Sequence, residues 1–142
     1  WAVTGVQTCA LPILTYDPKV ISLPFLLNLY FKSIDPTSVN KQGNDRGTQY
    51  RTGVYYVDPK DKEVIKKVFD EQQKHVNGKL AVELEPLKNF YKAEEYHQDY
   101  LDKHPTGYCH LPQALFEYAR KAKMKKWWFL SLVVVISYSD IA

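Results

Sequence analysis

Cysteine is scarce in this chain, which has only Cys9 and Cys109 among 142 residues. Two thiols cannot form a disulfide scaffold, so packing must hold the folded state, and a reducing compartment is the expected setting. The chain also lacks a large excess of either positive or negative charge. The 19 basic and 16 acidic side chains leave a net charge of +3, too balanced to indicate a nucleic-acid-binding surface. Tyrosine is abundant, at 11 residues, and the 45% apolar content is typical of one globular domain.

Several motifs of known chemistry are missing. The sequence has no GxxxxGK[ST] phosphate loop and no GxSxG elbow, which argues against nucleotide hydrolysis and serine acyl transfer. A loose cluster lacks the short paired spacings of zinc ligands, so we expect neither a metal nor another cofactor: His97, His104, Cys109 and His110. The basic run 120–126 is typical of a solvated helix end, and the longest apolar run is shorter than the roughly 20 residues that span a bilayer. We therefore expect no nucleic-acid partner and no membrane partner.

Composition divides the chain into three parts. Residues 1–14 contain no charged side chain, and residues 3–13 resemble the conceptual translation of a sequencing-adapter oligonucleotide. We interpret residues 1–14 as non-native, with a short apolar edge strand as the alternative, and because the first residue is Trp1 we expect a fragment. Residues 15–123 form the predicted domain. Residues 124–142 contain an apolar run that is either a buried strand or a segment read from a neighbouring frame.

Apolar periodicity predicts an α+β domain. A helix is expected over 22–34 with Ser22 as its cap, and a second over 59–76 with Asp58 as its cap. Between them we expect an exposed polar loop at 40–48 and a strand at 50–57, in which Gly53 marks a bulge or a close backbone approach. A strand at 80–85 and short helices at 93–102 and 113–123 follow. This order suits a sheet covered by helices.

Three phrases occur together in a fixed order. They are Asp35-Pro-Thr with the run 40–51, then Glu85-Pro-Leu-Lys-Asn-Phe-Tyr with the run 93–101, then Gly107-Tyr-Cys-His. From about Thr15 to Lys123 the chain thereby resembles the A-type peptide-methionine (S)-sulfoxide reductases. The resemblance implies a ferredoxin-like α/β roll in which a cysteine thiolate attacks the sulfur of oxidised methionine, in proteins or free. A second cysteine then forms a disulfide that thioredoxin reduces.

The resemblance also implies roles for particular residues. Tyr50 and Asp45 match groups near the sulfoxide, where a phenol or an acid can donate to the oxygen as negative charge develops on it. Cys109 matches the resolving cysteine. Three residues match positions that border the pocket for the S-methyl group: His97, Tyr100 and Tyr108. From the residues alone, the preferred interpretation of Tyr50 is a strand tyrosine packed on the core. Asp45 can equally be an Asx-turn residue.

The sequence lacks the part of the family's motifs that holds the nucleophile and the acid. The family's nucleophile lies in a Gly-Cys-Phe-Trp-Gly phrase and its glutamate acid in a His-x-Glu phrase before Tyr16-Asp17-Pro18, and neither phrase occurs here. Cys9 has neither the neighbours nor the position to replace the nucleophile. We therefore expect no reductase activity from the chain as written. Because the lost segment would contain central strands, we also expect four apolar residues to be poorly covered: Leu26, Leu27, Val68 and Phe69.

A noncatalytic interpretation is the alternative. In it, an α+β module binds peptides through a surface lined by Tyr96, Tyr100 and Tyr108, and Cys109 is incidental. For the reductase interpretation we expect a cytoplasmic monomer, since its thiols must stay reduced.

Overall fold

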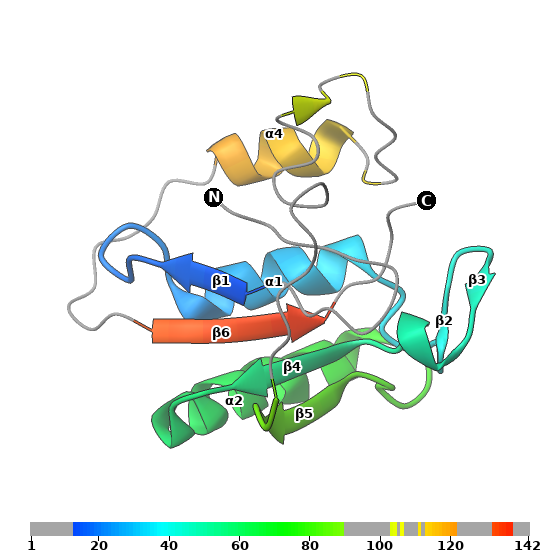
Figure 1. The fold of residues 1–142 in the computed structure, drawn as a ribbon, viewed down its shortest axis with the longest axis horizontal. Coiled ribbons are helices and arrows are strands. Elements are labelled where there is room, and N and C mark those ends of the chain that lie inside the picture. Colours follow the sequence, from blue (N-terminus) through cyan, green and yellow to red (C-terminus); the bar gives the residue numbers. More distant parts are fainter. Residues whose placement is uncertain are drawn as a thin grey trace.

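The structure is a computed structural model, and it describes residues 13–89, 103, 104, 106, 111, 113–121 and 132–137, without the side chains of Ile13, Gln49 and 132–137. Its elements in chain order are β1 (Ile13–Tyr16), α1 (Leu23–Ser33), β2 (Lys41–Gln42), β3 (Asp45–Arg46), the 3-10 turn η1 (Thr48–Tyr50), β4 (Gly53–Tyr56), α2 (Pro59–His75), β5 (Glu83–Pro86), α4 (Gln113–Lys121) and β6 (Leu132–Ser137). Four strands form one sheet in the order β1-β6-β4-β5, and β2 and β3 form a separate hairpin. Helices α1 and α2 lie behind this sheet (Figure 1).

The first helix begins and ends close to where its sequence predicts. The Ser22 hydroxyl accepts a hydrogen bond from the Phe25 N–H at 3.4 Å, which satisfies one of the N–H groups that a helix start leaves unpaired. Ile34 is extended and ends the helix. The apolar face of α1 is buried in the core, and Leu27 is fully buried. The predicted helix at 22–34 is therefore confirmed, with one residue fewer at each end.

The predicted strand at 50–57 is wrong at its first residues. Tyr50 lies in η1, where its N–H donates to the Gly47 carbonyl at 2.9 Å, and β4 begins only at Gly53. Gly47 has a φ of 142°, a value that glycine adopts readily and other residues rarely do, and it turns the chain into η1. The close backbone approach expected at Gly53 is confirmed, because a Cβ atom there would lie 2.8 Å from ring atoms of Tyr55.

The second helix and the strand after it differ in how well the sequence predicts them. Asp58 caps α2 by accepting from the Lys60 N–H at 2.9 Å, as predicted. The predicted strand at 80–85 begins too early, since β5 spans Glu83–Pro86. Leu80 donates its N–H to Gln73 Oε1 at 3.0 Å and Ala81 donates to the Pro36 carbonyl at 2.8 Å. These residues are bonded to α2 and to the loop after α1 instead of to β4.

The last strand in the chain lies in the middle of the sheet. β6 pairs antiparallel with β1 on one side, in the register Thr15↔Val133, and antiparallel with β4 on the other, in the register Gly53↔Ser137. β4 pairs parallel with β5. Residues 132–137 thus form a strand, one of the two structures that the apolar run allowed. β1 includes Ile13 and Leu14, the last two residues of the segment interpreted as non-native.

Both helices pack on this sheet around one core. Its buried apolar residues are Tyr16, Leu23, Leu26, Leu27, Tyr30, Phe31, Val54, Tyr56, Ile65, Val68 and Val82. The expectation that Leu26, Leu27 and Val68 are poorly covered is wrong, because at most 8% of each is exposed. Phe69 is partly buried, and its ring meets Phe31 edge-on with centroids 5.1 Å apart. The physical reason is that β6 fills the place between β1 and β4, so the sheet beneath the helices is continuous.

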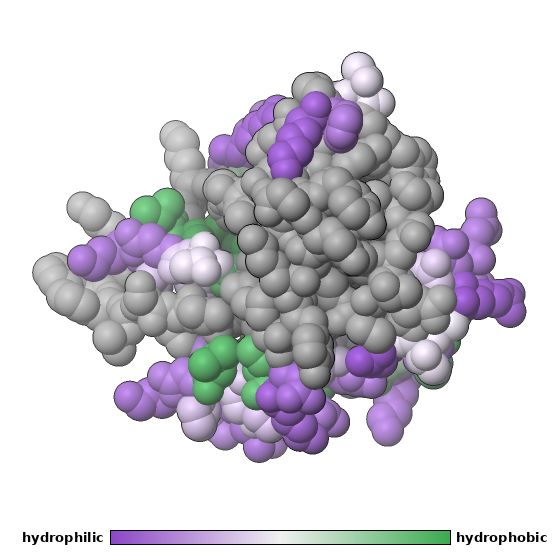
Figure 2. All heavy atoms as spheres, in the orientation of Figure 1, coloured by the Kyte–Doolittle hydropathy of each residue, from purple (hydrophilic) through white to green (hydrophobic). Residues whose placement is uncertain are grey.

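Helix α4 lies against α1. The rings of Tyr118 and Phe25 stack with centroids 6.2 Å apart, and the Lys32 ammonium lies 5.3 Å from the Tyr118 centroid. The predicted helix at 113–123 is confirmed over 113–121, and the one predicted at 93–102 lies outside the described residues. Among the described residues, no helix is long and apolar enough to cross a membrane. In the view of Figure 2 the described surface is mainly hydrophilic, with apolar atoms in small separate areas.

Candidate functional site

The loop from Asp35 to Thr52 carries the two candidate residues that the structure describes. It leaves α1, forms the β2–β3 hairpin, passes through η1 and enters β4. In Figure 1 the hairpin projects from the end of the sheet at which β4 begins. Both β2 and β3 contact η1, so the hairpin and the turn form one packed unit. The segment 40–48 of this loop was predicted to be exposed, and most of its residues are.

Gln42 is buried within this loop, with 5% of the residue exposed. Its Oε1 accepts from the Asp35 N–H at 2.9 Å, while its Nε2 donates to the Asp35 carbonyl and to Ser38 Oγ, both at 3.1 Å. The amide therefore makes three hydrogen bonds and joins the hairpin to the end of α1. The sequence gives no local signal for this role, because a glutamine in a polar loop is ordinarily solvated.

Asp45 and Tyr50 are brought onto the same packed unit. Asp45 lies in β3, paired with Gln42, and its side chain is exposed. Tyr50 ends η1 and is half-buried. The interpretation of Tyr50 as a strand tyrosine packed in the core is therefore wrong, since it lies in a turn before the strand. A half-buried phenol of this kind can donate a hydrogen bond to a ligand at the surface.

The other predicted site residues are not among those that the structure describes. They are Cys109, His97, Tyr100 and Tyr108, and Tyr96 of the alternative interpretation lies outside as well. Within the described part of the chain, no group of three or more His, Cys, Asp or Glu side chains could hold a metal ion.

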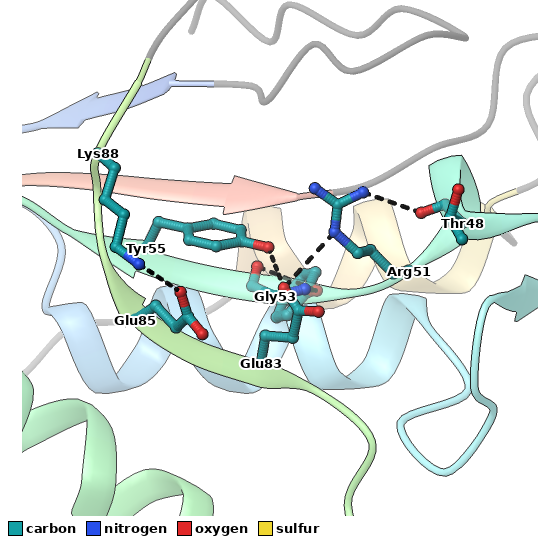
Figure 3. Close-up of polar contacts among 8 residues, drawn as sticks. Thr48, Arg51, Gly53, Tyr55, Glu83, Glu85 and Lys88 are labelled. Carbon is teal, nitrogen blue, oxygen red and sulfur yellow. Dashed lines mark hydrogen bonds and ion pairs between the residues drawn. The ribbon is translucent and has the colours of Figure 1, made fainter.

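A polar cluster next to η1 was not predicted from the sequence. Glu83 on β5 accepts a hydrogen bond from the Tyr55 hydroxyl, and its Oε2 lies 3.5 Å from Arg51 Nε. Arg51 also donates from Nη1 to the Thr48 carbonyl at 2.9 Å. Figure 3 shows the guanidinium between Thr48 and Glu83, with the Tyr55 ring alongside. We call Arg51, Tyr55 and Glu83 the Arg51 cluster. Glu83 lies about 30 residues away in the sequence from Arg51 and Tyr55, so only the folded chain reveals the cluster.

The electrostatics of the Arg51 cluster keep its phenol protonated. Burial and, after it, the neighbouring Glu83 carboxylate raise the pKa of Tyr55 to about 12, while Arg51 opposes both. Tyr55 is therefore a neutral donor at any physiological pH. Glu83 and Arg51 supply one negative and one positive charge, so the cluster is balanced.

A second tyrosine fixes the start of β4. The Tyr30 hydroxyl on α1 accepts from the Gly53 N–H at 3.1 Å and donates to the Gly53 carbonyl at 3.4 Å. Burial raises the pKa of Tyr30 well above its usual value. The start of β4, which follows η1, is thus hydrogen-bonded to α1. These bonds fix the backbone directly after η1.

Comparison with known proteins now identifies the family. Residues 10–128 match the family model described as peptide methionine sulfoxide reductase. This chain belongs to that family. It is 53% identical over 107 residues to a peptide methionine sulfoxide reductase MsrA of Lachnoclostridium phytofermentans, covering 75% of this chain and 64% of that protein. It is also 53% identical over 102 residues to the MsrA of Clostridium acetobutylicum, covering 72% and 63%. The chain therefore spans less than two thirds of the length of these relatives.

Solved structures of the family have the same fold. Mxr1 from Saccharomyces cerevisiae in reduced form matches with a TM-score of 0.62 and 49% identity over 66% of this chain and 52% of that one. Methionine sulfoxide reductase A of Corynebacterium diphtheriae matches with a TM-score of 0.61 and 32% identity over 67% and 50%. The predicted α+β fold of the methionine sulfoxide reductase A type is confirmed.

Proposed function

We propose that this chain carries the oxygen-binding side of a site that reduces methionine (S)-sulfoxide. Membership of the peptide methionine sulfoxide reductase family supports the reaction class. The observation that carries the assignment is the position of Tyr50 and Asp45, which share one packed unit at the end of the sheet. A half-buried phenol and an exposed carboxyl group there can meet the polar S–O bond of a methionine side chain that arrives from solvent.

The reaction that we propose balances as two thiols plus a sulfoxide giving a thioether, a disulfide and water. A thiolate attacks the sulfoxide sulfur, the S–O bond breaks, and the oxygen leaves with the thiolate sulfur as a sulfenic acid. The Tyr50 O–H donates to that oxygen as negative charge develops on it. A second thiol, in our proposal Cys109, then displaces hydroxide, which takes up a proton and leaves as water, and the disulfide forms.

Further parts of the proposal concern the partners and the setting. An external dithiol of the thioredoxin class would reduce the disulfide, and the substrates would be oxidised proteins, peptides or free methionine. His97, Tyr100 and Tyr108 would border the S-methyl group. A monomer in the cytoplasm suits a cycle that consumes reducing equivalents. The domain would comprise residues 15–123, with a non-native leader at 1–14 and an apolar tail at 124–142, of which residues 13, 14 and 132–137 extend the sheet as parts of β1 and β6.

Binding of the separated epimers of methionine sulfoxide tests the proposal directly. We expect the (S)-sulfoxide to shift the NMR signals of Tyr50 in the ¹³C-tyrosine-labelled chain, and the (R)-sulfoxide to do so less. Tyr50→Phe should weaken this binding about fivefold, since it removes one hydrogen bond worth about 1 kcal/mol. Tyr118→Phe on α4 is the matched control and should change nothing, because it removes only a hydroxyl and keeps the ring that stacks on Phe25. Equal binding by the wild-type chain and by Tyr50→Phe would contradict the proposal.

Turnover gives a second test. The purified chain with dithiothreitol should release no methionine from methionine sulfoxide, because neither Cys9 nor Cys109 lies in the family's nucleophile phrase. Turnover that disappears in Cys109→Ser would show that Cys109 attacks the substrate itself, and the assignment of Cys109 as the resolving thiol would then be wrong.

A further inference from the structure

The turn that carries Tyr50 is weakly held by its own backbone. η1 is a single 3-10 turn, and such turns have poor hydrogen-bond geometry. It is closed by a bond of 2.9 Å from the Tyr50 N–H to the Gly47 carbonyl and a long one of 3.4 Å from the Arg51 N–H to the Thr48 carbonyl. Gly47 before the turn has a φ of 142°. Other contacts must therefore fix the direction in which Tyr50 points.

The Arg51 side chain supplies such contacts. From the residue next to Tyr50 it bends back, so that Nη1 reaches the Thr48 carbonyl at 2.9 Å while Nε faces Glu83 Oε2 at 3.5 Å (Figure 3). The planar guanidinium can serve both acceptors at once, which a lysine ammonium on a flexible stem does less well. The two ends of η1 are thus joined to each other and to β5.

Glu83 is itself an anchored partner. Its N–H donates to the Thr52 carbonyl at 2.9 Å, and it is paired with Gly53 in the parallel ladder. Its carboxylate accepts from the Tyr55 hydroxyl, and the Tyr55 ring lies so close over Gly53 that no Cβ fits between them. The carboxylate that Arg51 meets therefore has both its backbone and its side chain fixed.

We propose that Arg51 and Glu83 are positioning residues that hold Tyr50 in the direction needed to meet the sulfoxide oxygen. This inference rests on the proposed function, which gives Tyr50 its role. The side chains of the pair are each 40% exposed, and ion pairs of that exposure contribute little to the stability of a whole protein. The effect of the pair is therefore local, on the geometry of η1.

Amide hydrogen exchange in the full ¹⁵N-labelled chain tests the positioning. We expect Arg51→Ala and Glu83→Gln to speed exchange at the Tyr50 N–H about fivefold, the upper end of what an exposed pair contributes. Arg51→Lys should restore part of the protection because it keeps the charge. Glu71→Gln is the matched control, since it breaks the exposed Glu71–Lys74 pair of 2.6 Å on α2 and should leave Tyr50 unchanged. The urea midpoint should shift no more in Glu83→Gln than in Glu71→Gln.

Unchanged exchange at Tyr50 in Arg51→Ala would overturn the inference, as would faster exchange spread over the whole sheet, which indicates a general structural role. Titration with methionine (S)-sulfoxide separates this inference from the proposed function. We expect Arg51→Ala to raise its dissociation constant about fivefold. If the wild-type chain does not bind the sulfoxide, the proposed function fails, while the exchange data still decide whether Arg51 and Glu83 hold the turn.

Discussion

The Asp61 carboxyl group lies in an unfavourable position at the start of α2. Only 2% of the residue is exposed, and Oδ2 has no hydrogen-bond partner among the described residues. Burial raises the pKa of Asp61 above its usual value, and the nearby Asp58 raises it further. The hydroxyl of Tyr16 is likewise buried without a partner in that part of the chain. Burial, and after it the charge of Asp61, raises the pKa of Tyr16 to about 12. A negative charge at Asp61 is therefore disfavoured in the folded state.

We predict that Asp61→Asn stabilises the protein at neutral pH by about 1 kcal/mol, because it removes a buried unpaired charge and keeps the shape of the side chain. Since the folded pKa is raised, the folded state binds this proton more tightly than the unfolded state. Stability should fall as the pH rises from the ordinary value of 3.8 to the folded pKa, and stay level above it. Urea unfolding at a series of pH values measures this. The gain should vanish below pH 3.8, and a gain that persists there would show that charge is not the cause.

Tyr55 and Glu83 allow a second prediction for single residues. Because the Glu83 carboxylate is the second cause of the raised pKa of Tyr55, Glu83→Gln should bring that pKa down from about 12, while burial, the larger cause, keeps it above 10.0. A pH titration of ¹³C-labelled tyrosine rings measures this value. Lys88→Gln, which breaks the 3.6 Å pair with Glu85 on the same strand, is the control and should leave Tyr55 unchanged. A Tyr55 pKa that stays at about 12 in Glu83→Gln would show that the negative charge of Glu83 contributes nothing to the shift.

At the scale of elements, the connection after α2 depends on Gly78. This residue has a φ of 116°, and a Cβ built there meets no atom within 4 Å. We predict that Gly78→Ala destabilises the protein by about 1–2 kcal/mol through backbone strain alone, since space is not limiting. Thermal unfolding measures the effect. Asn77→Ala, at the neighbouring position with a negative φ, should change stability by less than about 0.5 kcal/mol. Equal effects of the two substitutions would contradict the strain argument.

The elements also show what the sequence could predict. Both α1 and α2 were predicted well because Ser22 and Asp58 cap them through atoms two or three residues away. The start of β5 was missed because Leu80 and Ala81 are bonded to Gln73 and Pro36, which no local pattern reveals.

The candidate site could likewise be predicted from the sequence only in part. The family resemblance assigned Asp45 and Tyr50 to one site, and the structure has both on the loop before β4, although the residue pattern predicted a strand at Tyr50. The contacts of Gln42, Arg51 and Glu83 were missed, because they join segments that lie apart in the sequence. The roles given to Asp45, Tyr50 and Cys109 remain predictions.

At the scale of the whole molecule, the sheet depends on its last strand. Val134 is opposite Leu14 of β1 and Tyr56 of β4, so the backbone of β6 is paired on both sides. The position of β6 between two earlier strands explains why the core is covered, and periodicity within 132–137 could not have predicted it. Without β6, β1 and β4 would each have an unpaired edge beneath α1 and α2.

We therefore predict that Val134→Pro destabilises the fold by about 3 kcal/mol or more, since proline removes an N–H group and does not fit a central strand. Such a loss is a large fraction of the total stability of a small domain. Val134→Ala is the matched control, because it shortens the side chain and keeps the backbone N–H. Thermal unfolding followed by circular dichroism compares the two. If both variants unfold at the same temperature, pairing through β6 does not hold the sheet together, and the coverage of Leu26 and Leu27 must have another origin.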